Sequence, residues 1–234
     1  NLVDDMAYDF LTFAMPFKEN SAIGGHFTYL NLGDQISTDE NGIELGSFSS
    51  FMYALNLSYS QKVDENSSWG VNGKYFYQEL ADLSNVDAST GSFAVDVGYF
   101  RHNAMNNPNL TMGAVLTNLG PGVGFGDGEE DPLPTRLGFG IGLLMLEGAG
   151  NLAFDLNYEV NDQAMVTNLG FEYFLVENFA LRAGFMNDPS GELSYTTLGI
   201  GARLDPVGFD VSYVMGGNLD PHSNMVRFSL SGSF

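Results

Sequence analysis

The sequence has no cysteine, and this absence excludes both a disulfide framework and thiolate chemistry. Basic residues are scarce as well, because eight Lys and Arg stand against 29 Asp and Glu and give a formal net charge of −21. A chain of this charge is not expected to bind nucleic acid, since phosphate recognition needs clustered Lys and Arg. No apolar run approaches the roughly 18 residues of a membrane-spanning helix.

Glycine and aromatic residues are abundant instead. The chain has 29 Gly, 19 Phe and 11 Tyr. Gly is unfavourable inside helices and aromatic residues favour strands. The final segment, "NMVRFSLSGSF", shows how they are arranged: Val226, Phe228, Leu230 and Phe234 share one parity, and Arg227, Ser229 and Ser231 share the other. This two-residue period predicts a strand with one apolar and one polar face.

The same alternation recurs along the whole chain and predicts an all-β protein. We find no convincing helix, interdomain linker or low-complexity segment, and we therefore expect a single domain over residues 1–234. About thirteen strands are predicted, at residues 7–17, 21–33, 50–62, 68–80, 91–102, 110–119, 134–146, 151–160, 165–176, 179–187, 193–204, 208–216 and 224–234.

A soluble β-sandwich also alternates, but three features favour a transmembrane antiparallel β-barrel. The runs are long and nearly uniform, and the polar parity includes Gly and charges of both signs. The predicted connections also alternate, with long loops at 34–49, 81–90, 120–133 and 217–223 and tight turns between them. Long loops at one end and short turns at the other are typical of outer-membrane barrels, whose apolar parity faces lipid and whose polar parity faces the lumen.

Strand direction adds an expectation about the first strand. If Phe234 lies at the periplasmic end, the four long loops lie outside and strand 7–17 runs from outside to inside. Bacterial barrels have an even number of strands. We therefore expect fourteen strands in the intact barrel, the first of them in an N-terminal segment that is missing here. Strand 7–17 is then not expected to close antiparallel onto strand 224–234.

From about residue 110 the chain resembles a known family. The segments "LTNLGPGVGFGDGEEDPLPTRLGFGIG", "LAFDLNYEVNDQAMVTNLGFEYFLVENFALRAGF" and "LSYTTLGIGARLDPVGFDVSYV" are similar to the PorV/PorQ-type proteins, a branch of the FadL-like outer-membrane barrels. Upstream, "AYDFLTFAMPF" resembles the family less specifically. Members are expected to have fourteen strands and an N-terminal stretch with "GMGGA"-like and "WNPAG"-like motifs. Neither motif occurs in this sequence.

The resemblance implies a location and two possible functions. The location is the bacterial outer membrane, in contact with its lipid. Known members include a shuttle protein of type IX secretion, which implies a non-enzymatic barrel that binds protein partners of a secretion or cell-surface assembly system. FadL relatives transport hydrophobic molecules, which leaves a channel for hydrophobic small molecules as the alternative.

Charged residues on the polar parity are the predicted lumenal group. A Lys or Arg on the lipid face near the midplane costs about 2–4 kcal/mol, which inward placement avoids. Opposite charges on neighbouring strands can then pair and fill the lumen, a simpler interpretation than a selectivity filter. The group comprises Lys74, Asp96, Arg136, Asp155, Glu172, Arg182, Arg203, Asp210 and Arg227.

Acidic residues in the predicted outer loops form the candidate partner-binding surface. They are Asp34, Asp39, Glu40, Glu44, Asp127, Glu129, Glu130 and Asp131. The segment "GDGEEDP" has alternating carboxylates but does not fit an EF-hand, since Pro132 replaces the turn Gly and Gly138 stands at position twelve. We therefore predict a solvated acidic surface and no dedicated metal site. It could bind a basic partner, or bridge to anionic lipid through divalent cations.

Catalytic motifs are not apparent. His26, His102 and His222 fall in different predicted strands or loops, so no Ser/His/Asp set can be assembled from them. The sequence has no GxGxxG, P-loop, HExxH or CxxC motif. We expect neither an enzyme nor a bound cofactor.

Overall fold

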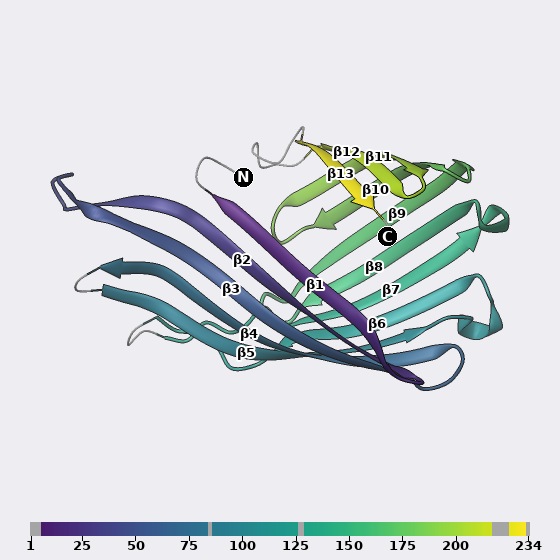
Figure 1. The fold of residues 1–234 in the computed structure, drawn as a ribbon, viewed down its shortest axis with the longest axis horizontal. Coiled ribbons are helices and arrows are strands. Elements are labelled where there is room, and N and C mark those ends of the chain that lie inside the picture. Colours follow the sequence, from purple (N-terminus) through teal and green to yellow (C-terminus); the bar gives the residue numbers. More distant parts are fainter. Residues whose placement is uncertain (1–5, 84–85, 126–128, 217–224, 233–234) are drawn as a thin grey trace. The chain divides into compact units, whose positions relative to one another are not determined.

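The computed structural model describes residues 6–83, 86–125, 129–216 and 225–232. Thirteen strands form one antiparallel sheet, in which hydrogen-bonded neighbours follow sequence order from β1 to β13 (Figure 1). In these ranges the only helices are two single 3-10 turns, η1 (Ala104–Asn106) and η2 (Leu146–Gly148). No helix in the described part of the chain is long and apolar enough to cross a bilayer.

The strands confirm the predicted count and lie close to the predicted ranges. Their bounds are β1 Ala7–Lys18, β2 Ser21–Thr38, β3 Glu44–Lys62, β4 Ser67–Leu83, β5 Val86–Arg101, β6 Leu110–Leu119, β7 Arg136–Met145, β8 Gly150–Glu159, β9 Ala164–Val176, β10 Phe179–Asp188, β11 Leu193–Leu204, β12 Val207–Met215 and β13 Met225–Gly232.

Two of the predicted long loops are wrong. Most of 34–49 is strand, because β2 continues to Thr38 and β3 begins at Glu44; within 81–90, residues 81–83 and 86–90 are also strand. These stretches have polar residues on both parities and therefore lack the alternation that identified the other strands. The predicted loop 120–133 is confirmed for its described residues, 120–125 and 129–133, which lie between β6 and β7. The predicted loop 217–223 lies outside the described residues.

Internal contacts divide the chain into two compact units. Unit 1 comprises Asn1–Gly98 and Leu116–Thr135, and unit 2 comprises Tyr99–Val115 and Arg136–Phe234. Each unit contains a run of adjacent strands, β1 to β4 in unit 1 and β7 to β13 in unit 2.

Strand register separates the two parities of unit 2 onto two faces. Leu181 pairs with Ile200, Ile200 with Val211, and Val211 with Phe228, so these apolar side chains share the apolar face. All of them except Val211 are exposed. On the other face Arg182 pairs with Glu172 and Gly199, Gly199 with Ser212, and Ser212 with Arg227. This second face is called the polar face below.

Unit 1 has the same two faces. Lys74 pairs with Asn56, and Asn72 with Ser58, on its polar face. The opposite, apolar face of β2, β3 and β4 has two groups of rings. The larger group comprises Phe27, Tyr29, Phe51, Tyr53, Tyr75 and Tyr77, with Tyr53 and Tyr77 stacked at a centroid distance of 5.4 Å. Nearer the tight turn between β3 and β4, the rings of Tyr59 and Trp69 are in contact at 5.9 Å.

Candidate functional site

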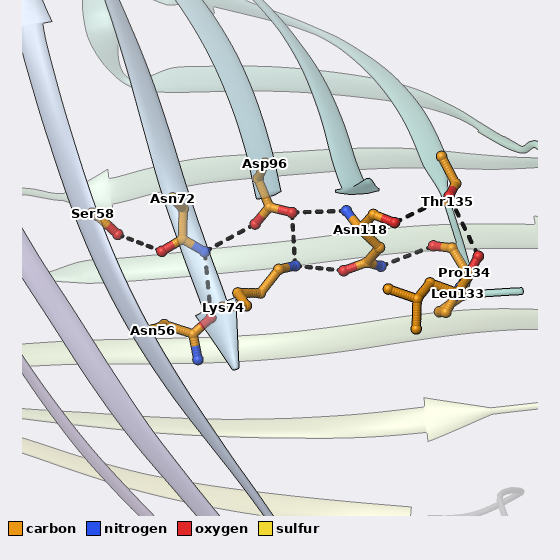
Figure 2. A network of polar contacts seen from close by, with 9 residues as sticks. All are labelled: Asn56, Ser58, Asn72, Lys74, Asp96, Asn118, Leu133, Pro134 and Thr135. Atoms are coloured by element: carbon orange, nitrogen blue, oxygen red, sulfur yellow. Dashed lines mark hydrogen bonds and ion pairs between the residues drawn. The ribbon is translucent and has the colours of Figure 1, made fainter. Parts of the chain in front are cut away.

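A polar network on the polar face of unit 1 is centred on Lys74, Asp96 and Asn118 (Figure 2). Lys74 Nζ lies 2.7 Å from Asp96 Oδ1 and also donates to the side-chain oxygen of Asn118. The backbone N–H of Asn118 donates to the same carboxylate oxygen over 2.8 Å. Both charged side chains are about one-fifth exposed, at 20% for Lys74 and 17% for Asp96. The network thus joins β4, β5 and the end of β6.

Neutral side chains extend this network across β3 and β4. Asn72 Nδ2 donates to Asp96 Oδ2 at 3.0 Å and to Asn56 Oδ1 at 3.3 Å (Figure 2). Ser58 Oγ donates to Asn72 Oδ1 at 2.9 Å. Asn56 is only 2% exposed. Buried amides are stabilising only when they are hydrogen-bonded, and this chain of contacts meets that need.

Asn118 connects the network to the segment that follows β6. Its Nδ2 donates to Pro134 O at 2.8 Å, and its carbonyl accepts from Thr135 Oγ1 at 3.1 Å. Its φ of 60° lies in the left-handed region, which Asn tolerates better than most residues. One residue therefore contacts β4, β5 and the last residues before β7 through both its side chain and its backbone.

The described parts of the segment between β6 and β7, residues 120–125 and 129–135, are called the strap. Its base is an antiparallel bridge in which the backbones of Val123 and Asp131 exchange hydrogen bonds of 2.8 and 2.7 Å. Ser92 Oγ, on the polar face of β5, donates to Pro121 O at 3.1 Å. A Cβ at Gly120 would lie 2.1 Å from Phe93 O and 3.2 Å from Ala94 Cα. The strap therefore lies directly against the polar face of β5.

Unit 2 has a separate charged cluster on its polar face. Arg182 Nε of β10 lies 2.6 Å from Glu172 Oε2 of β9, and Arg182 Nη1 contacts Asp210 Oδ1 of β12. The second contact passes over β11 at Gly201, where a Cβ would lie 2.6 Å from Asp210 Oδ1 and 2.8 Å from Arg182 Nη1. The Arg182 side chain is 43% exposed, so water screens this cluster more than the network of unit 1.

A groove of about 300 Å³ adjoins this cluster, at the end of the strands where the tight turns lie. Glu172, Arg182, Arg203 and Asp210 line it with Phe174. A groove lined by charges of both signs favours a solvated or ion-paired interior over an apolar ligand.

Residues 34–49 form the end of the hairpin of β2 and β3, a two-stranded segment that is called the arm below. The pairing of β1 with β2 begins at Ala7–Asn31, and the pairing of β3 with β4 begins at Phe51–Glu79. Beyond these points the described pairs of β2 and β3, from Asp34–Ser49 onward, are with each other alone. Three of the largest side chains of the arm, Ile36, Ile43 and Leu45, are 61–68% exposed.

The tip of the arm is a turn organised by Asp39. Its Oδ1 accepts the backbone N–H groups of Asn41 and Ile43, each at 2.8 Å. The pKa of Asp39 is lowered from its ordinary value, mainly because its carboxylate accepts the hydrogen bond from Ile43. An ionised Asp39 therefore stabilises this turn.

The predicted acidic residues do not form one cluster in the structure. Asp34 and Glu44 lie in strands of the arm, Asp39 and Glu40 lie in its turn, and Glu129, Glu130 and Asp131 lie in the strap. Asp127 lies outside the described residues, as does His222. In the described ranges no group of three or more His or carboxylate side chains is placed to hold a metal ion.

The predicted lumenal charges share the polar face within their units. Lys74 and Asp96 lie in the network of unit 1. In unit 2, Arg136 pairs with Glu159 and Asp155 with Gly140 on one face, and Arg203 pairs with Gly208 beside Asp210. The sequence predicted that opposite charges on neighbouring strands can pair, but it did not predict that Arg182 contacts Glu172 and Asp210. Asn56, Asn72, Asn118 and Thr135 were missed, and the one sequence signal for Asn118 was its position before the turn residues "LGPG".

Comparison with known proteins identifies one family and several similar folds. Residues 1–169 match the family model for the type IX secretion system protein PorV. No curated protein sequence matches the chain.

Three solved structures illustrate the likeness of fold. The toluene transporter TodX of Pseudomonas putida is 12% identical over 88% of this chain and 74% of its own, with a TM-score of 0.62. A FadL homologue of Pseudomonas aeruginosa is 12% identical over 88% of this chain and 68% of its own, with a TM-score of 0.57. CdiB from Acinetobacter baumannii is 12% identical over 96% of this chain and 49% of its own, with a TM-score of 0.55. At these identities the likeness concerns the fold alone.

Proposed function

Because the chain belongs to the PorV family of type IX secretion proteins, we propose that it serves protein secretion or cell-surface assembly by binding protein partners at its acidic outer surface. It is an outer-membrane β-barrel protein of bacteria, with the fold of FadL-type barrels. The function is non-enzymatic on this proposal. The observation that supports it most is the arm, in which the described pairs from Asp34–Ser49 onward join β2 and β3 only.

The aromatic groups of unit 1 indicate where its strands cross the membrane. Phe51 and Tyr59 belong to the two groups of rings and are eight residues apart in β3. At about 3.4 Å per residue this is about 27 Å along the strand. For a strand tilted by about 40° it corresponds to about 21 Å across the membrane, comparable to the roughly 25 Å apolar band between the aromatic girdles of outer-membrane barrels. Phe51 is aligned with Asn31 of β2 and with Glu79 of β4. Polar side chains therefore begin to appear on the apolar face at the level of Phe51.

The arm then extends beyond the apolar band, on the outer side in the orientation predicted from the sequence. A two-stranded hairpin is marginally stable on its own in water. Exposed apolar side chains beside acidic ones are a suitable docking surface for a protein whose apolar contact area is rimmed by Lys and Arg. The acidic members are Asp34, Asp39, Glu40 and Glu44, and the strap adds Glu129, Glu130 and Asp131.

The test is recovery of partners from native membranes under gentle extraction. The variant D34N/D39N/E40Q/E44Q removes four charges from the arm and should reduce co-purification by about tenfold, with a stronger loss at low salt, because the removed charges are screened by ions. A matched control, E19Q/E65Q/E147Q/E177Q, removes four exposed charges at the tight-turn end and should leave recovery unchanged. Purification of the wild-type chain without any partner would contradict the proposal.

A channel for hydrophobic small molecules remains the second candidate, supported by the fold shared with TodX, whose structure is described as a toluene transporter. A site for a hydrophobic ligand is expected to be lined mainly by apolar side chains. The groove beside Arg182 and the network of unit 1 are instead lined by charged and amide groups, and they therefore do not favour this function. Uptake of a radiolabelled aromatic hydrocarbon into vesicles distinguishes the two. Uptake far above that of empty vesicles, with no partner recovered, would favour the channel.

A further inference from the structure

The strap is an ordered part of unit 1 in contact with the polar face of the sheet. We propose that Asn118 is a positioning residue that holds the strap against β5, so that the strap shields this part of the polar face from water-soluble solutes. This inference does not depend on partner binding at the acidic surface. It assigns a role to a connection that the sequence suggests is only a solvated outer loop.

Asn118 is suited to this role because its polar groups have partners on both sides of the connection. Its N–H and side-chain oxygen face Asp96 and Lys74, and its Nδ2 and carbonyl face Pro134 and Thr135. Hydrogen bonds to charged groups are stronger than those between neutral groups. The residue also adopts a φ of 60°, which most replacements with a Cβ tolerate less well.

The strap is held by packing as well as by polar contacts. Leu133 is 5% exposed and Ala94 is 2% exposed, and Gly120 lies between them. A Cβ at Gly120 would meet Phe93 O and Leu133 Cδ1 at 2.1 and 2.9 Å, so the backbone approaches β5 as closely as a side-chain-free residue permits. Ser92, also 5% exposed, donates to Pro121 O from β5. Access to Ser92 therefore requires the strap to move.

The absence of cysteine gives a direct way to measure that movement. Ser92→Cys places a single thiol of nearly the same size under the strap. The rate at which a charged, membrane-impermeant thiol reagent modifies it in reconstituted protein reports how often the strap opens. The single variant should react slowly, and adding Asn118→Ala should raise the rate by about tenfold, as expected from the loss of the two side-chain hydrogen bonds, one with the charged Lys74 and one with Pro134 O. Equal rates with and without Asn118 would overturn the proposal.

Two further variants separate the side-chain role from the backbone conformation and from folding. Asn118→Gly permits the left-handed backbone but lacks the side chain, so it should accelerate labelling as Asn118→Ala does. Slow labelling in Asn118→Gly would show that the backbone conformation alone holds the strap, and would overturn the proposal. Thr135→Val removes the hydrogen bond to Asn118 O and a longer one to Leu133 O, and it should accelerate labelling by roughly threefold in a folded protein. Arg182→Met, in unit 2, should leave the rate unchanged.

Discussion

The polar clusters of the two units are built from similar residues, but the cluster of unit 2 links strands of the sheet, whereas the network of unit 1 also contacts the strap. In unit 2, Arg182 joins Glu172 and Asp210, which all lie on strands that are already hydrogen-bonded in the sheet. In unit 1, Lys74 and Asp96 act with Asn118 to hold a segment that is not part of the sheet. Loss of the first cluster should weaken contacts within an intact sheet, whereas loss of the second should release a segment of chain.

Burial strengthens this difference. Lys74 and Asp96 are about one-fifth exposed, while Arg182 and Asp210 are about two-fifths exposed. Exposed ion pairs contribute little to stability, but an unpaired charge left in a sheltered site is costly. Large effects are therefore expected from changes in unit 1 and small ones from equivalent changes in unit 2.

The largest effect is expected for Asp96→Ala. This change removes the partner of Lys74 and leaves the Asn118 N–H without its acceptor. We expect the free energy of unfolding to fall by about 3 kcal/mol, reduced from the buried limit by partial exposure. Urea titration in lipid vesicles measures it. Asp155→Ala on the polar face of unit 2 is the matched control, and a loss of equal size there would remove the distinction between the units.

Two glycine substitutions sharpen the comparison. Gly120→Ala introduces a Cβ 2.1 Å from a backbone oxygen, whereas Gly201→Ala introduces one 2.6 Å from the end of the Asp210 side chain. Side-chain ends can move more easily than backbone, so we expect a loss of about 3 kcal/mol for Gly120→Ala and about 1 kcal/mol for Gly201→Ala. Gly73→Ala has open space and is the reference. The same unfolding titration ranks the three, and the reverse order for Gly120 and Gly201 would contradict the packing described for the strap.

Removing the positive charge of Arg182 should have a smaller effect. Arg182→Met leaves Glu172 and Asp210 without their shared partner, but water reaches both. We expect a loss of about 1 kcal/mol that shrinks as salt is raised, because exposed charges are screened. Unfolding of the variant and the wild type at low and high ionic strength measures the effect. A loss that is independent of salt would show that the cluster is less hydrated than its exposure indicates.

The smallest effect concerns the turn at the tip of the arm. The pKa of Asp39 is lowered in the folded chain, so its contribution is present above the ordinary pKa of an aspartate and is lost as the pH falls through the lowered value. The protection of the Asn41 and Ile43 amides, that is, their exchange rates corrected for the intrinsic dependence on pH, should fall over that acidic range in the wild type. In Asp39→Asn this pH dependence of the protection should be absent. Unaltered pH dependence in that variant would assign the effect to another group.

Alternation made most of the fold predictable. Where one face is apolar, as in β9 to β13, the two-residue period fixed strand positions to within one or two residues of those observed. It failed in the arm and at the ends of β4 and β5. Strands there leave the apolar surroundings, so neither parity is required to be apolar.

The candidate site was less predictable because it depends on contacts across several strands. The polar parity of Lys74, Asp96 and Arg182 follows from the cost of exposing charge to lipid. Which partner each of them contacts depends on the register between strands, and on glycines such as Gly201 that leave room for a contact across a strand. The pattern within a single strand does not contain this information. Asn118 was overlooked because its importance lies in a left-handed backbone conformation and in partners fifteen or more residues away.

The contact of Arg182 with Asp210 across Gly201 also has a consequence for assembly of the sheet. If β11 slipped by one residue, Ile200 or Ala202 would occupy the position of Gly201, and its Cβ would lie within 3 Å of both charged groups. A slip by two residues in one direction would bring Arg203 there instead, beside Arg182. The ion pair can therefore form in full only when three successive strands are correctly aligned, so it favours the observed register of β10, β11 and β12 over these shifted alignments.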